Sequence, residues 1–118
     1  MTYSDSNNIL SLLDSLTAGS NEDIAMQLAN DFRKRRIEKN LTRQNLSDQS
    51  NVAISNITRF EQKGLISLKH LIALAVALGY THEITSIFAT PKYSTMAELT
   101  QIRKNSGKTK AYPKHPRP

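Results

Sequence analysis

Apolar residues recur along most of the chain at spacings of three and four residues, which is the pattern of amphipathic α-helices. Ile24, Leu28 and Phe32 follow one another at four-residue intervals, and Asn21 stands before them, where its side chain would cap the first turn. Asn40 follows the last turn and is expected to end the helix. The pattern therefore predicts one long helix as the first element of a folded domain.

Two shorter helices separated by a brief turn are predicted next. Thr42 is placed to cap a helix at residues 43–50, in which Leu46 points inward. After the turn, a second helix spans about residues 54–62 and ends at Gly64, a residue that readily adopts the left-handed backbone of a helix end. Pairs of this kind are common, and most of them do not bind DNA.

Two further helices complete the predicted domain. Ser67 is placed to cap a helix at residues 68–78, which Gly79 is expected to terminate. Its inward stripe consists of Leu71, Ala75 and Leu78. A fifth helix is predicted at residues 82–88, where Ile84, Ile87 and Phe88 are apolar. Because no strand pattern and no internal repeat is present, the predicted fold class is all-α, with a five-helix domain at residues 21–90.

Shorter segments flank this domain on both sides. Residues 1–20 are predicted to be an N-terminal extension with a short amphipathic helix at about 8–16. Residues 91–118 follow Pro91, and Thr95–Glu98 has the form of a capping box at the start of a small helix. From Asn105 onward there are too few apolar side chains to form a core, so this tail is predicted to be disordered.

The composition excludes several classes of protein. None of the 118 residues is cysteine, which rules out a disulfide framework, a cysteine-ligated zinc site and a thiol nucleophile. The longest apolar run, residues 71–78, is far too short to span a membrane, and the first residues lack the basic start of a secretory signal. We therefore expect a cytoplasmic protein that has no membrane partner.

The whole formal net charge of +6 lies in the last quarter of the chain. Residues 1–88 carry nine basic and nine acidic side chains, whereas residues 89–118 carry seven basic side chains against Glu98 alone. Basic tails commonly contact phosphate backbones or acidic partner surfaces. A tail that only aids solubility is the alternative.

The residue pattern of the helix pair at 41–61 favours DNA binding over the other uses of such a pair. Asn51 occupies the turn, where left-handed backbone geometry is needed and Asn is the best substitute for Gly. Val52 and Ile57 are predicted to point inward and to fix the angle between the two helices. The outward face of the second helix then consists of Ala53, Ile54, Ser55, Thr58 and Arg59.

This stretch resembles the helix-turn-helix of the phage-repressor-like (Cro/C1, or XRE) family of DNA-binding proteins, and the likeness extends over residues 28–88. Leu41–Thr42 matches the usual Leu-Thr of the family, Arg36 matches its frequent first-helix arginine, and Glu61 matches the acidic residue that closes its recognition helix. The resemblance implies an ion pair between Arg36 and Glu61. The sequence departs from the family pattern at Arg35, Arg43 and Asn51.

We expect DNA recognition by the helix at about 54–62, laid into the major groove, where each base pair displays a distinct pattern. Arg59 would donate two hydrogen bonds to a guanine, Ser55 and Thr58 would bond bases or phosphates, and Ala53 and Ile54 would pack on thymine methyl groups. The DNA backbone would be gripped by Thr42, Arg43, Gln44 and, more weakly, Arg33. One small domain makes few contacts, and the family resemblance, together with the surplus of apolar residues at both ends of the chain, implies a homodimer on a palindromic operator.

A narrower resemblance links residues 58–79 to the HipB-type regulators, which are encoded beside HipA-like kinase toxins. The segment Thr95-Met96-Ala97-Glu98-Leu99, followed by a basic tail, is similar to theirs as well. This resemblance implies an antitoxin that represses its own operon and binds a HipA-like kinase toxin. The alternative is a stand-alone phage- or plasmid-type repressor. A protein-interaction adaptor that no longer binds DNA is a third hypothesis, and the polar outward face speaks against it.

No grouping of residues predicts catalysis, a metal site or a cofactor. Residues 106–109 match the end of a phosphate-binding loop, but Ile102 stands where that motif needs its first glycine. The three histidines lack metal-ligand spacing, and no nucleophile–base pair is apparent. The sequence therefore predicts a DNA-binding protein and not an enzyme.

Overall fold

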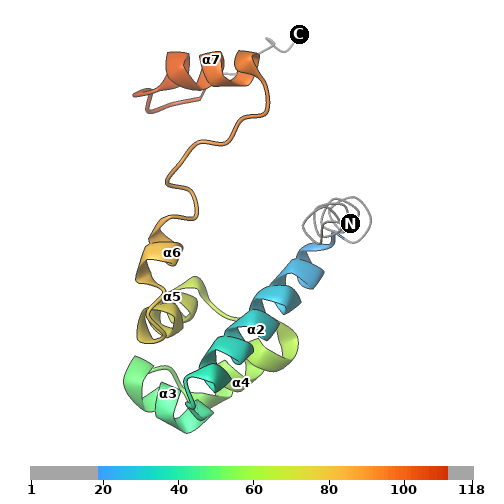
Figure 1. Ribbon diagram of the computed structural model, residues 1–118, viewed down its shortest axis with the longest axis vertical. Helices are drawn as coiled ribbons and strands as arrows, with labels where there is room; N and C mark the ends of the chain where they lie inside the picture. The colour runs from blue at the N-terminus through green and yellow to red at the C-terminus, as the bar shows by residue number, and fades with distance from the viewer. Residues whose placement is uncertain (1–18, 112–118) are drawn as a thin grey trace, which may run out of the picture. The chain divides into compact units, whose positions relative to one another are not determined.

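The computed structural model describes residues 19–111, and within that range it contains six helices and no strand. The helices are α2 (Asn21–Glu38), α3 (Arg43–Ser50), α4 (Ile54–Lys63), α5 (Leu68–Ala77), α6 (Thr81–Thr85) and α7 (Met96–Asn105) (Figure 1). The predicted all-α fold is confirmed. The helix expected at 8–16 and the end of the basic tail lie outside the described residues.

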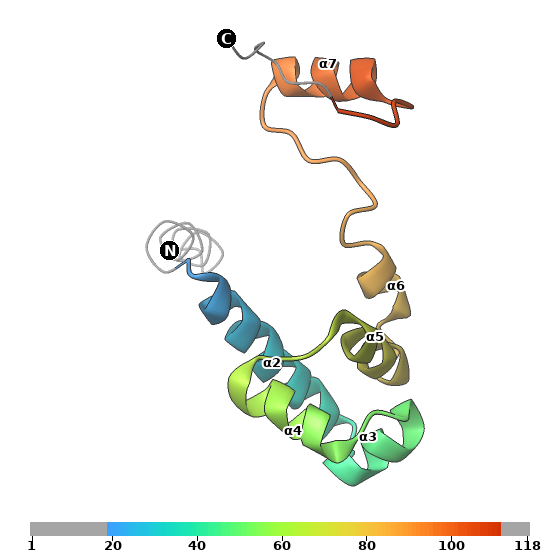
Figure 2. The same cartoon turned by 180° about the vertical axis from the view of Figure 1, so that it is seen from behind.

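The chain divides into two compact units, at residues 1–84 and 85–118. In the first unit, α2 and α4 run side by side, and α3 packs against both α4 and α5 (Figure 2). The core lies where these helices meet: the rings of Phe32 and Phe60 are 5.1 Å apart between centroids. The other members of the buried cluster are Ala29, Leu46, Val52, Ile57, Leu74 and Leu78.

The helix-turn-helix segment forms as the local sequence predicts. Thr42 Oγ1 accepts a hydrogen bond from the Asn45 backbone N–H at 2.9 Å, and Asn45 Oδ1 accepts one from the Thr42 N–H at 3.1 Å, which makes a reciprocal cap for α3. Asn51 ends α3 in the left-handed region, with a φ of 62°. Val52 and Ile57 are both buried, as expected, so the turn places α4 on the core at a fixed angle.

Three details of the other helices differ from the predictions. The cap of α2 is Ser20, whose Oγ accepts from the Asp23 N–H at 3.0 Å, and Asn21 is the first helical residue. Ser67 caps α5 as predicted, but Leu74 is fully buried whereas Leu71 is only partly so. Thr95 caps α7, but Glu98 Oε1 accepts from the Ser94 hydroxyl instead of completing a capping box.

The fifth helix of the domain is shorter than predicted. It spans Thr81–Thr85, and the side chains of Ile87 and Phe88 are 61% and 94% exposed. Ile87 and Phe88 belong to the second compact unit, and neither is a member of the described buried cluster. Apolar spacing alone therefore predicts too long a helix, because spacing does not show whether there is a surface for the helix to pack against.

Gly64 is predicted to be the glycine that tolerates a side chain least. It has a φ of +68°, and a Cβ there would lie 3.1 Å from the Ala25 carbonyl carbon and 3.2 Å from the Met26 backbone nitrogen. We expect Gly64→Ala to cost about 1–2 kcal/mol for the left-handed backbone, plus the cost of pushing α4 away from α2.

The matched control is Gly79→Ala, because Gly79 has a φ of +86° but only Lys39 Nζ at 4.0 Å near its added Cβ. The free energies of unfolding of both variants, from urea titrations, measure the difference. Equal losses in the two variants would contradict the close approach of α4 to α2.

Candidate DNA-binding surface

Helix α4 has one buried face and one exposed face. Ile57 and Phe60 belong to the core, whereas Ala53, Ile54, Ser55 and Arg59 are exposed and Thr58 is partly exposed. The five residues predicted to face outward therefore lie at the surface, although Thr58 is the least accessible of the exposed set. The face is mixed in chemistry: it offers a guanidinium, two hydroxyl groups and two small or branched apolar side chains.

Glu61, near the end of α4, is the centre of a cluster of arginines. Its carboxylate is fully buried and accepts from Arg36 Nε at 2.7 Å and from Arg36 Nη2 at 2.9 Å. Arg36 Nη1 also donates to the Leu41 carbonyl oxygen at 2.8 Å. A two-point contact of this kind fixes direction as well as distance, so α2, the start of α3 and α4 are held in one arrangement.

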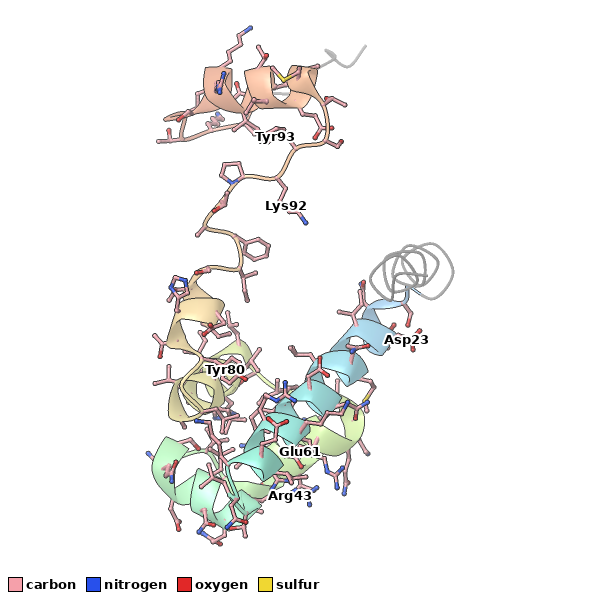
Figure 3. All side chains as sticks on the ribbon, in the orientation of Figure 1. Asp23, Arg43, Glu61, Tyr80, Lys92 and Tyr93 are labelled. Atoms are coloured by element: carbon pink, nitrogen blue, oxygen red, sulfur yellow. The ribbon has the colours of Figure 1, made fainter. Side chains whose placement is uncertain are left out.

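Two more arginines approach the same carboxylate. Arg43 Nε donates to Glu61 Oε1 at 3.0 Å (Figure 3). Arg33 Nε lies 4.0 Å from the same oxygen. The Arg43 side chain is one-third exposed and that of Arg33 is 57% exposed, whereas Arg36 is buried. Three guanidinium groups thus surround one carboxylate, and the excess positive charge lies at the surface beside α3 and α4.

The remaining residues predicted to grip the DNA backbone are at the start of α3. Thr42 is exposed and its hydroxyl oxygen is engaged in the helix cap. Gln44 is exposed, and its Nε2 donates to Asp48 Oδ1 at 2.9 Å. The structure therefore gives each of these side chains an intramolecular partner: the cap formed by Thr42 was predicted, whereas the bond from Gln44 to Asp48 was not.

A hollow beside the exposed face of α4 was also missed by sequence reasoning. It has a volume of about 430 Å³ and is lined by Asn56, Arg59, Leu65, Ile66, Ser67 and His70. His70 sits in the first turn of α5, and Arg59 comes from α4. The short connection at residues 64–67 between α4 and α5 is the only sequence signal that could have indicated that Arg59 and His70 line one hollow.

Residues 32–84 match a protein family described as Helix-turn-helix, and no curated protein matches the chain. The matched segment begins within α2 and contains α3, α4 and α5 whole. Residues 32–84 therefore form a helix-turn-helix domain of the Cro/C1 type, a DNA-binding domain of transcriptional regulators. Among the described residues, no helix is long and apolar enough to cross a membrane, and no three metal-binding side chains converge.

Removing the carboxylate of Glu61 is predicted to destabilise the domain strongly. Glu61→Ala leaves Arg36 buried without a counter-charge, and losing one partner of a buried ion pair typically costs about 3–5 kcal/mol. The free energy of unfolding from denaturant titration measures this loss.

Glu38→Ala is the matched control, because Glu38 pairs with Arg35 on the exposed surface of α2. An exposed pair contributes at most about 1 kcal/mol, so this variant is expected to unfold almost as the unchanged protein does. A Glu61→Ala variant as stable as Glu38→Ala would refute a structural role for the arginine cluster.

Proposed function

We propose that this protein is a sequence-specific repressor that binds a palindromic operator as a homodimer and reads bases with the exposed face of α4. The observation that carries the proposal is the division of α4 into a buried face and a polar outward face, within a helix-turn-helix domain. A helix needs this division to pack on its own domain and enter the major groove at the same time.

Each residue of the outward face has a role in the proposal. Arg59 donates two hydrogen bonds to guanine O6 and N7, which is the commonest specific contact in the major groove. Ser55 and Thr58 donate to bases or phosphates through their hydroxyl groups. Ala53 and Ile54 stand at the start of α4 and pack on thymine methyl groups.

The proposed backbone contacts come from the rim of the same surface. One guanidinium is enough to neutralise Glu61, so Arg33 and Arg43 leave a surplus of positive charge. They would therefore attract phosphates while they keep their contact with Glu61. Thr42 and Gln44 are exposed at the start of α3 and would contribute neutral hydrogen bonds. Contacts of this kind position the domain and carry no sequence information.

Arg59→Ala is predicted to cost about 1–3 kcal/mol of binding to the operator, and the loss should be concentrated at one base pair. Titration of labelled operators, each with one base pair changed, measures it. In the variant, replacing the contacted guanine should no longer weaken binding.

Lys34→Ala is the control, because Lys34 is an exposed cation of α2 that has no role in the proposed contacts. It should bind every operator variant about as well as the unchanged protein. If Arg59→Ala weakens binding to operator and random DNA equally, Arg59 contacts only phosphate and the base assignment is wrong.

A second candidate function is that of a HipB-like antitoxin that also binds a HipA-like kinase toxin. It is supported by the resemblance of residues 58–79 and of the segment 95–99 to such regulators. The segment 95–99 starts α7 in the second compact unit, which lies outside the matched helix-turn-helix domain. A partner-binding role for that unit would leave the DNA-binding surface free.

The basic tail is predicted to act on DNA. A chain that ends at Asn105 lacks Lys108, Lys110, Lys114 and Arg117, and each phosphate that they neutralise adds about 0.9 to the slope of log K against log salt. We expect truncation to flatten that slope by up to about 3.6 and to weaken operator and random DNA alike. Binding titrations over a range of salt concentrations measure the slope.

The control is a full-length chain with these four residues changed to glutamine, which keeps the length and removes the charge. It should behave as the truncated chain does. An unchanged slope in both variants would refute the DNA role. If truncation then abolished co-purification with a HipA-like kinase encoded by the neighbouring gene, the tail would belong to the toxin contact instead.

A further inference from the structure

The first two turns of α2 carry apolar side chains that the core does not use. Ile24 and Leu28 are 62% and 48% exposed. The side of α2 that faces the core is marked by Ala29, Phe32 and Arg36, which are buried. Each step of four residues turns a helix by about 40°, so Leu28 lies at the edge of this buried side and Ile24 lies further round. We call Ile24 and Leu28 the α2 flank.

The described residues leave the α2 flank uncovered. The principal neighbour of α2 is α4, and the end of α4 approaches another side of α2: a Cβ added to Gly64 would lie 3.1 Å from Ala25 and 3.2 Å from Met26. The first turn of α2, drawn in blue, projects past α4 in both views (Figures 1 and 2). Asp31 and Arg35 follow along the same side, so the apolar part is confined to the first two turns. It therefore fits a short apolar partner, about eight residues long if that partner is a helix.

We propose that residues 9–16 cover the α2 flank as a second helix, antiparallel to the first two turns of α2. These residues lie outside the described part of the chain. Their sequence contains five apolar side chains, and four of them have the spacing of one helix face: Ile9, Leu12, Leu13 and Leu16. A helix of eight residues is marginal in water by itself, because its nucleation is costly, so it needs a surface to pack against. The inference does not depend on the proposed function.

The length of the connection favours this occupant over a second copy or another protein. Ser20 is fixed as the cap of α2 by the hydrogen bond that its Oγ accepts from the Asp23 N–H. Only residues 17–20 separate the segment from α2, and two antiparallel helices are commonly joined by two to five residues. Four residues span at most about 14 Å, so Leu16 stays beside the first turns of α2. The segment therefore meets the α2 flank at a high effective concentration, which a separate chain does not have.

The spacing of the apolar residues matches on the two sides of the connection. Leu16 and Asn21 flank the connection, so the contacts of an antiparallel pair are found by counting outward from these two residues. Leu13 and Ile9 come three and seven residues before Leu16. The two residues of the α2 flank come three and seven residues after Asn21. The facing pairs are therefore Leu13 with Ile24 and Ile9 with Leu28.

A double-mutant cycle in the full chain tests the first of these contacts, with alanine at both sites because alanine preserves a helix. Leu13→Ala and Ile24→Ala should each lower the melting temperature by on the order of 3–6 °C. The double variant should lose at least about 2 °C less than the sum of the two, because both changes remove the same contact. Circular dichroism melts measure the three shifts.

The control combines Leu13→Ala with Ile37→Ala, because Ile37 is also half exposed on α2 but lies in its last turn. The shifts of this pair should add, since the two sites are far apart. Additive shifts for Leu13→Ala and Ile24→Ala would overturn the inference. An Ile24→Ala variant that melts as the unchanged protein does would overturn it as well.

The absence of cysteine from the sequence allows disulfides to report the facing pairs. Leu13→Cys with Ile24→Cys in one chain should form an intramolecular disulfide under mild oxidation, because a disulfide needs Cα atoms within about 7 Å. Ile9→Cys with Leu28→Cys should do the same. The control is Ser11→Cys with Ile24→Cys, because Ser11 is two residues from Leu13 and stands on the opposite side of the segment. It should oxidise much more slowly.

Mass spectrometry of the oxidised samples shows what occupies the α2 flank. A disulfide within one chain supports the inference. A disulfide between two chains shows that a second copy covers the α2 flank and overturns the inference, and free thiols in both facing pairs overturn it as well. Neither test contains DNA, so this inference and the proposed function fail separately.

Discussion

The arrangement of the helix-turn-helix domain depends on one buried carboxylate. Glu61 belongs to α4, Arg36 to α2 and Arg43 to α3, so the ion pairs join three helices at one point. A buried ion pair adds little net stability, because both charges lose water when they are buried. Its value here is directional: the two-point contact of Arg36 and its bond to the Leu41 carbonyl oxygen allow only one placement of α4 relative to α2. The orientation of the proposed reading face follows from that placement.

The elements that the sequence predicted well are those determined by neighbouring residues. Thr42 and Asn45 form their cap within one turn, and Asn51 adopts left-handed backbone within the residues that need it. The contact between Arg36 and Glu61 came from family resemblance, and the structure places the two side chains together. What the sequence could not predict depends on neighbours far away in the chain. The fifth helix stops at Thr85, and Arg43 turns to Glu61, eighteen residues further on. No local pattern encodes either event, and the contacts with DNA stay predictions.

The faces of α4 and α5 divide the surface of the first unit by chemistry. The outward face of α4 presents a guanidinium and two hydroxyl groups beside two apolar side chains, whereas the exposed Leu68, Ile72 and Val76 of α5 are all apolar. Water competes strongly for the first set, so that set suits a partner with fixed donors and acceptors, such as base edges. Burial of the apolar side chains is driven by the removal of water alone, and it needs only a surface of matching shape. The loop at residues 64–67 joins the two helices, and Gly64 holds its start close to the backbone of α2. Movement of one surface relative to the other would therefore disturb the packing of α2.

The surplus of arginine around Glu61 connects the stability of the domain with its proposed attraction to DNA. Glu61 needs one cation to be neutralised, and the buried Arg36 supplies it through two hydrogen bonds. Arg43 and Arg33 approach the same oxygen but remain partly in water, so their charge is not used up inside the domain. A phosphate that approached them would form new charge-assisted contacts without exposing Glu61, because Arg36 would still satisfy the carboxylate. The three arginines are therefore not equivalent: burial assigns Arg36 to the fold and leaves the other two able to serve both the fold and the nucleic acid.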